Sequence, residues 1–268
     1  MKEYYLKNDM IYFPALESYD SWLGHSFSTR KGGVSEGIFA SMNLSFQRGD
    51  DPKKVMENFE IISEKLGMPL SRFVFSDQTH TANVRIVTNE DAGAGITREK
   101  NYTDVDGLIT HEKGLVLSLF FADCVPIFLA DPKTHTIALL HSGWRGTVAG
   151  IEEAAVRKMG EAFESDPADI VAVIGPSICK DCYEVGFDVA DEFRRGFEGV
   201  LEADGKSPDK YQLDLWEANR QVLLRAGLSE DNITISGLCT CCNPDLLFSH
   251  RASLGKRGNL GAFMFLRE

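Results

Sequence analysis

Three apolar runs in the middle of the chain, at residues 115–121, 125–130 and 136–140, follow one another with little sequence between them. Short runs rich in Val, Ile, Leu and Phe predict buried strands. The four residues 131–134, with the sequence DPKT, separate the last two runs and predict a hairpin turn. Strands joined by such a turn are antiparallel, so this arrangement disfavours a doubly wound parallel sheet.

Helical periodicity is clearest between Pro52 and Gly67, where Asp51 is a good amino-terminal cap and Gly67 a good carboxyl-terminal end. Apolar residues recur there at spacings of four and three, namely Val55, Phe59, Ile62 and Leu66. Strands therefore outnumber helices, because further strands are predicted at 73–75, 84–87, 170–174, 233–238 and 260–266, and further helices at 148–159, 188–197 and 214–226. This pattern predicts an α+β fold of mixed sheets. No linker or repeat interrupts residues 1–268, which we expect to form a single domain.

The chain carries a formal net charge of -12 and six cysteines in 268 residues. The negative charge disfavours a nucleic acid or an anionic membrane as the main partner, because both bind basic surfaces. Residues 1–10 mix apolar with charged side chains, and no long apolar segment follows, so neither an export signal nor a membrane span is expected. We therefore expect a cytoplasmic protein whose cysteines are thiols or metal ligands.

Three side chains that bind metals stand at or near the ends of apolar runs: His80, Cys124 and His141. Zinc and copper accept imidazole and thiolate together, and three protein ligands leave a fourth position open, as in catalytic zinc sites. The intervals of 44 and 17 residues match no local zinc motif. Taken singly, Cys124 also fits a small buried apolar residue, and each histidine a satisfied polar group.

Glycines bracket Trp144 and Arg145 directly before a predicted helix. Tight turns of this kind display large side chains, so Trp144 is a candidate stacking surface for a base or sugar and Arg145 a candidate phosphate ligand. Asp123, next to Cys124, is a candidate acid that orients a histidine, although a solvent-facing carboxylate is equally compatible with the sequence.

Arg30 precedes a glycine pair typical of anion-binding turns, and Asn43 follows closely enough to reach the same place. A solvated arginine is the ordinary alternative. His250 lies beside Arg251 and is a candidate cleft residue, whereas the context of His25, His111 and His135 suggests no function.

The remaining cysteines form two groups, Cys179 with Cys182 and Cys239 with Cys241 and Cys242. They can supply four thiolates to a structural zinc, and Cys239 and Cys242 have the spacing of a zinc-binding pair. The second group is not a simple pair, however, so buried thiols or an oxidising pair are the favoured interpretation.

Several of these segments together resemble the bacterial laccase-domain proteins, also called the multicopper polyphenol oxidase or purine nucleoside phosphorylase family. The matching segments span most of the chain in order, at residues 29–35, 78–80, 104–107, 122–126, 141–146, 175–176, 182–186 and 248–251. Residues 255–259 depart from the Gly-Arg ending associated with many members, so no role is carried to Arg257. The resemblance implies one domain with two packed mixed sheets and helices outside.

The resemblance also implies that His80, Cys124 and His141 bind the metal, expected to be zinc, with copper as an alternative. It implies phosphorolysis of adenosine, inosine and methylthioadenosine, with adenosine deamination, so purine nucleosides and phosphate are the expected partners. The candidate catalytic residues are Cys124, Arg145 and Asp123. The candidate substrate-binding residues are Arg30, Asn43, Gln78, Trp144 and His250.

Three other functions stay open on sequence grounds. A copper-dependent polyphenol oxidase is one, although six histidines are too few for the several copper centres of a true laccase. A hydrolase that uses Cys124 and a histidine on a peptidoglycan precursor is another. A metal-binding module without catalysis is the third. The pattern decides neither the preferred substrate nor the oligomeric state.

Overall fold

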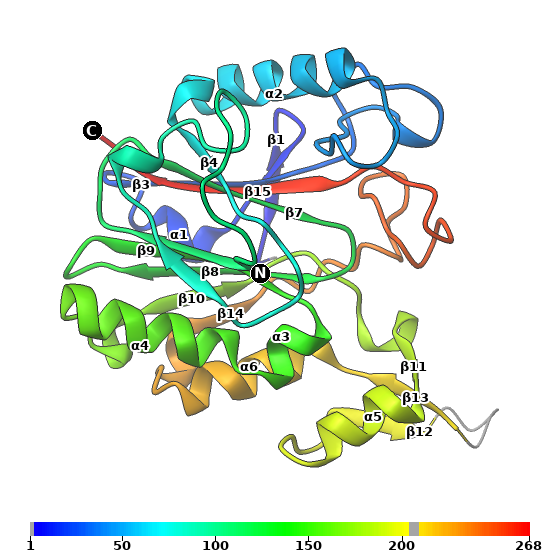
Figure 1. The fold of residues 1–268 in the computed structure, drawn as a ribbon. Coiled ribbons are helices and arrows are strands. Elements are labelled where there is room, and N and C mark those ends of the chain that lie inside the picture. Colours follow the sequence, from blue (N-terminus) through cyan, green and yellow to red (C-terminus); the bar gives the residue numbers. More distant parts are fainter. Residues whose placement is uncertain (1–2, 204–208) are drawn as a thin grey trace.

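The computed structural model describes residues 3–203 and 209–268, so the first two residues of the amino-terminal segment lie outside it. Within these ranges, two six-stranded mixed sheets pack against one another, with helices on the outside and a small three-stranded sheet at one end (Figure 1). The α+β architecture of mixed sheets predicted from the sequence is therefore confirmed.

The first sheet brings together both ends of the described chain. In order across the sheet, its strands are β1 (Tyr5–Lys7), β2 (Met10–Tyr12), β3 (Leu23–Ser28), β15 (Leu260–Leu266), β7 (Val116–Phe121) and β4 (Phe73–Phe75). The last strand of the chain, β15, therefore lies between β3 and β7, and only the edge pair of β7 with β4 is parallel.

The second sheet is built around the predicted hairpin. Its Asp131 side chain accepts hydrogen bonds from the backbone N–H groups of Lys133 and Thr134, which shapes the turn as the sequence predicts. Across the sheet, the strands are β14 (Ile233–Ile235), β10 (Val171–Ile174), β8 (Val125–Asp131), β9 (Thr136–Ser142), β6 (Gly107–Thr110) and β5 (Val84–Ile86).

The helix predicted after Asp51 is confirmed as α2 (Pro52–Leu66), whose cap Asp51 accepts from the N–H of Lys53. The helix predicted over 148–159 is instead two helices, because Gly150 adopts a left-handed φ of 71° between them. The helices other than α2 are α1 (Pro14–Glu17), α3 (Trp144–Val148), α4 (Ile151–Phe163), α5 (Phe187–Arg194) and α6 (Leu215–Arg225). Short 3-10 turns lie at Gly37–Phe39, Leu70–Arg72, Asn89–Asp91, Pro167–Asp169, Lys180–Cys182 and Glu230–Asn232.

The small sheet, which was not predicted, consists of β11 (Glu184–Gly186), β13 (Lys210–Leu213) and β12 (Leu201–Ala203). Together with α5 it projects beside the ends of the two large sheets (Figure 1). Three and four residues are too few for the alternation of apolar and polar side chains to reveal a strand.

Apolar side chains fill three layers. Phe128 and Leu139 of the second sheet meet Leu117 and Met264 of the first between the sheets. A second cluster packs α4 and α6 beneath the second sheet, and a third packs α2 over the first (Figure 1). Strands covered on both faces are continuously apolar, which explains the runs seen in the sequence. The central strands are thus packed on both faces.

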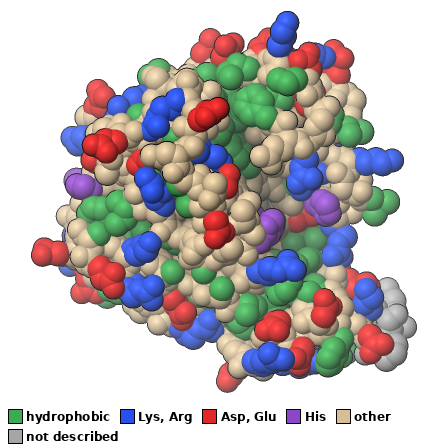
Figure 2. Space-filling model, in the orientation of Figure 1, with side chains coloured by type: hydrophobic (Ala, Val, Ile, Leu, Met, Phe, Trp, Pro, Cys, Tyr) green, Lys and Arg blue, Asp and Glu red, His purple; other side chains and the backbone are tan. Residues whose placement is uncertain are grey.

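On the face drawn in Figure 2, acidic and basic side chains are interspersed and form no broad patch of one sign. No helix among the described residues is both long and apolar enough to cross a bilayer.

Candidate active site

His80, Cys124 and His141 meet at one end of the two large sheets. One ligand atom from each lies within 4.8 Å of the others. His141 belongs to β9, Cys124 stands just before β8, and the register that pairs Pro126 with His141 brings these two positions side by side. His80 arrives from the connection between β4 and β5. The structure therefore brings together the three residues that the sequence nominated as ligands.

The backbone is unusual at two of these positions. His80 has a φ of 67° and Asp123, next to Cys124, a φ of 90°, both in the region that non-glycine residues rarely adopt. Hydrogen bonds hold these conformations, since the N–H of His80 donates to the Asp106 carboxylate at 3.1 Å. Strain of this kind is often concentrated at functional sites. The bend expected beside Cys124 lies at Asp123, while Pro126 continues as part of β8.

Asp106 is the carboxylate that orients the candidate metal ligand His141. It is fully buried, and its Oδ1 accepts from Nδ1 of His141 at 2.7 Å. Burial acts to raise the pKa of Asp106, but the hydrogen bond and charge of His141 and the N–H groups of Thr81 and Thr79 hold that pKa well below its ordinary value. With Nδ1 engaged, Nε2 of His141 is left to serve as the ligand atom.

Asp123 does not orient a histidine, contrary to the role predicted for it. Its carboxylate accepts from the Thr240 hydroxyl at 2.6 Å and from the Arg251 backbone N–H at 2.7 Å. Asp123 is also largely buried, so it is not a solvent-facing acid. Its position beside Cys124 makes it a support for the thiol-bearing turn. Asp106 was missed because no apolar pattern marks it as a contact of His141, 35 residues away.

Cys124 and His141 form a coupled pair. Burial acts to raise the pKa of the Cys124 thiol, but the nearby imidazoles of His141 and His80 lower it to about 6. Burial acts to lower the pKa of His141, but the Cys124 thiolate and the Asp106 carboxylate raise it to about 9. Thiolate is thus the favoured form of Cys124 near neutral pH, and thiolate is the form that binds metals.

A metal ion fits the space between these side chains. A Cβ placed on Gly143 would lie 3.0 Å from Cδ2 of His80 and 3.2 Å from Sγ of Cys124, so glycine keeps the centre of the group open. The donor set of two imidazoles and one thiolate is one that zinc and copper accept. The residues present therefore suit the metal that the resemblance implies.

The three candidate ligands line a cavity of about 390 Å³, which lies within the range of small-molecule sites. Its wall includes three aromatic side chains and three cationic ones, Phe46, Phe75, Phe120, Arg48, Lys100 and Arg257. Lys100 is paired with Asp77 and also donates to the backbone of Ser76. The two arginines have no such carboxylate partner among the described residues. The cavity thus combines flat apolar surfaces with positive charge.

Arg257 is the most distinctive residue of this wall. Its side chain is buried, and its Nε has no hydrogen-bond partner within the described ranges. Burial, together with the nearby Arg48, lowers the pKa of the guanidinium to about 10. A buried cation beside a second cation is costly unless an anion joins them. From the sequence, no role is carried to Arg257, because residues 255–259 depart from the Gly-Arg ending of the family that the chain resembles.

Gln78 also lines the cavity, but its side-chain amide is engaged by the backbone of Phe120, with Nε2 to the carbonyl at 2.7 Å and Oε1 accepting from the N–H at 2.8 Å. This pairing fixes the aromatic wall. Trp144 and Arg145 do not line the cavity. Instead the Arg145 guanidinium stacks 4.2 Å above the Trp144 ring. Trp144 packs against the apolar cluster that joins α4 and α6 to the second sheet.

The other predicted substrate residues, Arg30, Asn43 and His250, do not line the cavity. Arg30 donates to the carbonyls of Ala40 and Pro244. Asn43 is buried, and its Oδ1 accepts from the N–H of the lining residue Asn259 at 3.0 Å. His250 is exposed, with Nδ1 3.5 Å from the Arg257 guanidinium. Asn43 and His250 thus contact lining residues, whereas Arg30 does not.

This chain is similar to known proteins in both sequence and fold. A family model described as multi-copper polyphenol oxidoreductase laccase matches residues 24–267. The chain belongs to this family. A relative named purine nucleoside phosphorylase YlmD, from Bacillus subtilis (strain 168), is 41% identical over 245 residues, which cover 90% of this chain and 88% of the relative.

Two further members of the laccase family extend the likeness. A protein named adenosine deaminase RL5, from an unknown prokaryotic organism, is 35% identical and covers 84% of this chain and 87% of its own length. The crystal structure of YlmD from Geobacillus stearothermophilus superposes with a TM-score of 0.92 at 36% identity and covers 100% of both chains. Family membership, which the motifs indicated, is confirmed.

Proposed function

We propose that this chain is a metal-dependent purine nucleoside phosphorylase that also deaminates adenosine. The observation that carries the proposal is one cavity that joins the ligand group His80, Cys124 and His141 to the buried, partly unpartnered guanidinium of Arg257. The names of the relatives supply the substrate class, since purine nucleoside phosphorylase and adenosine deaminase both act on purine nucleosides.

Arg257 and Arg48 would bind the phosphate. Two guanidinium groups next to one cavity match a dianion, and their fork geometry suits its oxygens. In phosphorolysis, a phosphate oxygen forms a bond to C1′ of the ribose as the bond from C1′ to the purine nitrogen breaks, and the departing base takes up a proton. Holding phosphate at a fixed place makes this attack effectively intramolecular.

The aromatic wall would bind the base. Phe46, Phe75 and Phe120 supply apolar faces, and Gln78 holds Phe120 in place through its two backbone hydrogen bonds. Stacking against aromatic rings tolerates both adenine and hypoxanthine, because every purine has a π-face. This wall would therefore accept the bases of both adenosine and inosine.

His80, Cys124 and His141 would hold the metal, with Asp106 fixing the His141 ring. When bound there, zinc supplies Lewis-acid chemistry that polarises a substrate or solvent oxygen. Deamination replaces the amino group of adenosine by oxygen from water and releases ammonia. Copper would suit the same donors, but only two of the six histidines stand in a ligand group of the described chain, too few for a multicopper relay.

A second candidate is a hydrolase with Cys124 as nucleophile. It is favoured by the lowered pKa of Cys124, about 6, and by the adjacent His141, which resemble an activated thiolate and its base. Removal of metal separates the two functions. Zinc chemistry requires the ion, whereas a thiolate nucleophile keeps its activity in chelator.

The decisive experiment incubates the purified protein with adenosine, with and without inorganic phosphate, and separates the products by chromatography. Adenine and ribose 1-phosphate, formed only with phosphate, would support phosphorolysis, and inosine formed in both reactions would support deamination. Absence of all three products would overturn the proposal.

The assay is repeated on protein treated with a chelator, and again after zinc or copper has been added back. Recovery with one metal identifies the active ion, and full activity without metal would contradict the metal dependence of the proposed reaction. Elemental analysis of the untreated protein provides the matching stoichiometry.

A further inference from the structure

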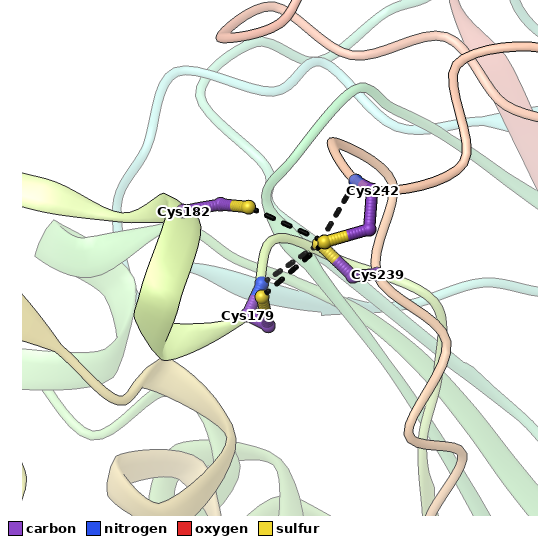
Figure 3. A group of neighbouring side chains, drawn as sticks. All are labelled: Cys179, Cys182, Cys239 and Cys242. Carbon is purple, nitrogen blue, oxygen red and sulfur yellow. Dashed lines mark hydrogen bonds between the residues drawn. The ribbon is translucent and has the colours of Figure 1, made fainter.

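Four cysteines outside the cavity converge from two loops (Figure 3). Cys179 precedes the 3-10 turn Lys180–Cys182, which ends at Cys182, and Cys239 and Cys242 lie on the loop after β14. Sγ of Cys182 lies 3.4 Å and Sγ of Cys179 3.9 Å from Sγ of Cys242, and all four sulfur atoms fall within 4.8 Å of one another. The group is not a set of separate buried thiols, because Cys242 is exposed.

The surroundings of Cys239 favour a metal-bound thiolate. Its sulfur accepts two backbone hydrogen bonds, from the N–H of Cys179 at 3.3 Å and from the N–H of Cys242 at 3.4 Å. Donors aimed at a sulfur stabilise its negative charge and orient it as a ligand. The guanidinium of Arg251 donates to the carbonyl of Cys182 at 3.1 Å and places a positive charge beside the group.

We propose that Cys179, Cys182, Cys239 and Cys242 bind a zinc ion in a closed structural site, separate from the site in the cavity. Both halves have two residues between their cysteines, the spacing common among structural zinc sites. Four thiolates complete a tetrahedral shell, so no position is left for a substrate. The group can bind a metal, and its closure assigns it a structural role.

The site would brace the turn that carries Cys124. Thr240 lies between two of the cysteines and donates its hydroxyl to Asp123 at 2.6 Å. Arg251, which contacts the Cys182 carbonyl, donates its backbone N–H to the same carboxylate at 2.7 Å. Asp123 immediately precedes Cys124. The zinc therefore joins two loops whose contacts hold Asp123 in its left-handed conformation.

Metal analysis of the full-length protein, purified under reducing conditions, tests this proposal. We expect about two zinc ions per chain in the wild type, one for each ligand group. Cys239→Ser and Cys242→Ser should each lower the ratio to about one, as should Cys124→Ser through the other site. Cys241→Ser is the matched control, because it alters a cysteine of the same loop outside the group of four, and it should retain both ions.

Cobalt substitution provides a second readout that does not depend on activity. In Cys124→Ser, the remaining cobalt should show the intense sulfur-to-metal absorption of a four-thiolate site, and this absorption should vanish in the double variant with Cys239→Ser. Loss of the structural zinc should also lower Tm by about 5 °C or more, because metal binding contributes to folding. Cys242→His, which keeps a zinc ligand, should retain the ion and most of the stability.

The retained ion in Cys242→His separates loss of a ligand from general misfolding. A wild-type ratio that Cys239→Ser and Cys242→Ser leave unchanged would overturn the proposal, as would iron in place of zinc or a disulfide among these cysteines in the reduced protein. A chain that binds zinc at the four cysteines but forms none of the three nucleoside products would contradict the proposed function and leave the structural zinc site standing.

Discussion

Nδ1 of His141 lies 2.7 Å from Oδ1 of Asp106, and both side chains are buried. The same carboxylate accepts from the backbone N–H groups of Thr79, His80 and Thr81. One buried acid therefore positions two of the three candidate metal ligands, the ring of His141 directly and His80 through its backbone.

Asp106→Asn should lower metal affinity by about 10- to 100-fold, because an amide carries no charge and orients the imidazole less strongly. Competition with a chromogenic chelator measures the affinity. Asp104→Asn is the matched control, since Asp104 lies on the same segment and its carboxylate accepts from Asn83 and Thr79, neither of which is a candidate ligand. Equal affinities for both variants and the wild type would contradict the positioning role.

Gly143→Ala should disable the site without disturbing the backbone. The φ of -74° and ψ of 169° at Gly143 suit alanine, but its Cβ would lie 3.0 Å from His80 and 3.2 Å from Cys124. Crowding between the ligands should cost about 100-fold in kcat/KM, the scale of a small misplacement of reacting groups. Gly196→Ala meets no atom within 4 Å and should keep full activity. Full activity of Gly143→Ala would mean that the centre is not occupied.

Eight strands of the two large sheets and α2 could be predicted because their signals are local, whereas β1, β2, β3 and β6 were not predicted. Buried strands are continuously apolar, and Asp51 and Gly67 mark the ends of α2 through their own backbone preferences. The approach of Cys124 to His141 also followed from local information, since a hairpin places the start of β8 beside the end of β9. Such features need no knowledge of distant parts of the chain.

The rest of the site depends on contacts between distant segments. Asp106 meets His141 across 35 residues, and Arg257 enters the cavity from an irregular loop. Neither position shows a periodic pattern, so only the folded chain reveals them. The four cysteines illustrate the same limit, because their spacing allowed a zinc site but their convergence depends on how two loops pack.

Arg257→Met should raise the KM for phosphate by about 10- to 100-fold, the loss expected when a charge-assisted hydrogen bond is removed. Initial rates at varied phosphate with saturating adenosine measure this constant. Arg145→Met tests the residue first nominated from the sequence, which is exposed and stacked on Trp144, and should change the constant much less. The reverse order would return the phosphate site to Arg145.

Glu152 provides a test of stability that is independent of catalysis. It is fully buried near the start of α4, and neither carboxylate oxygen has a hydrogen-bond partner within the described ranges. Burial raises the pKa of Glu152 from 4.5 to about 8. The folded chain therefore favours the neutral acid.

Because the folded pKa lies above the unfolded one, stability from neutral Glu152 is complete below about pH 4.5 and is lost as the pH rises through about 8. The loss is on the order of 5 kcal/mol in the free energy of unfolding. Glu152→Gln, which stays neutral, should flatten this dependence in urea unfolding measured between about pH 5 and 8. Glu153→Gln, its partly exposed neighbour, should keep the wild-type slope. Equal slopes in all three proteins would show that Glu152 is ionised in the folded chain.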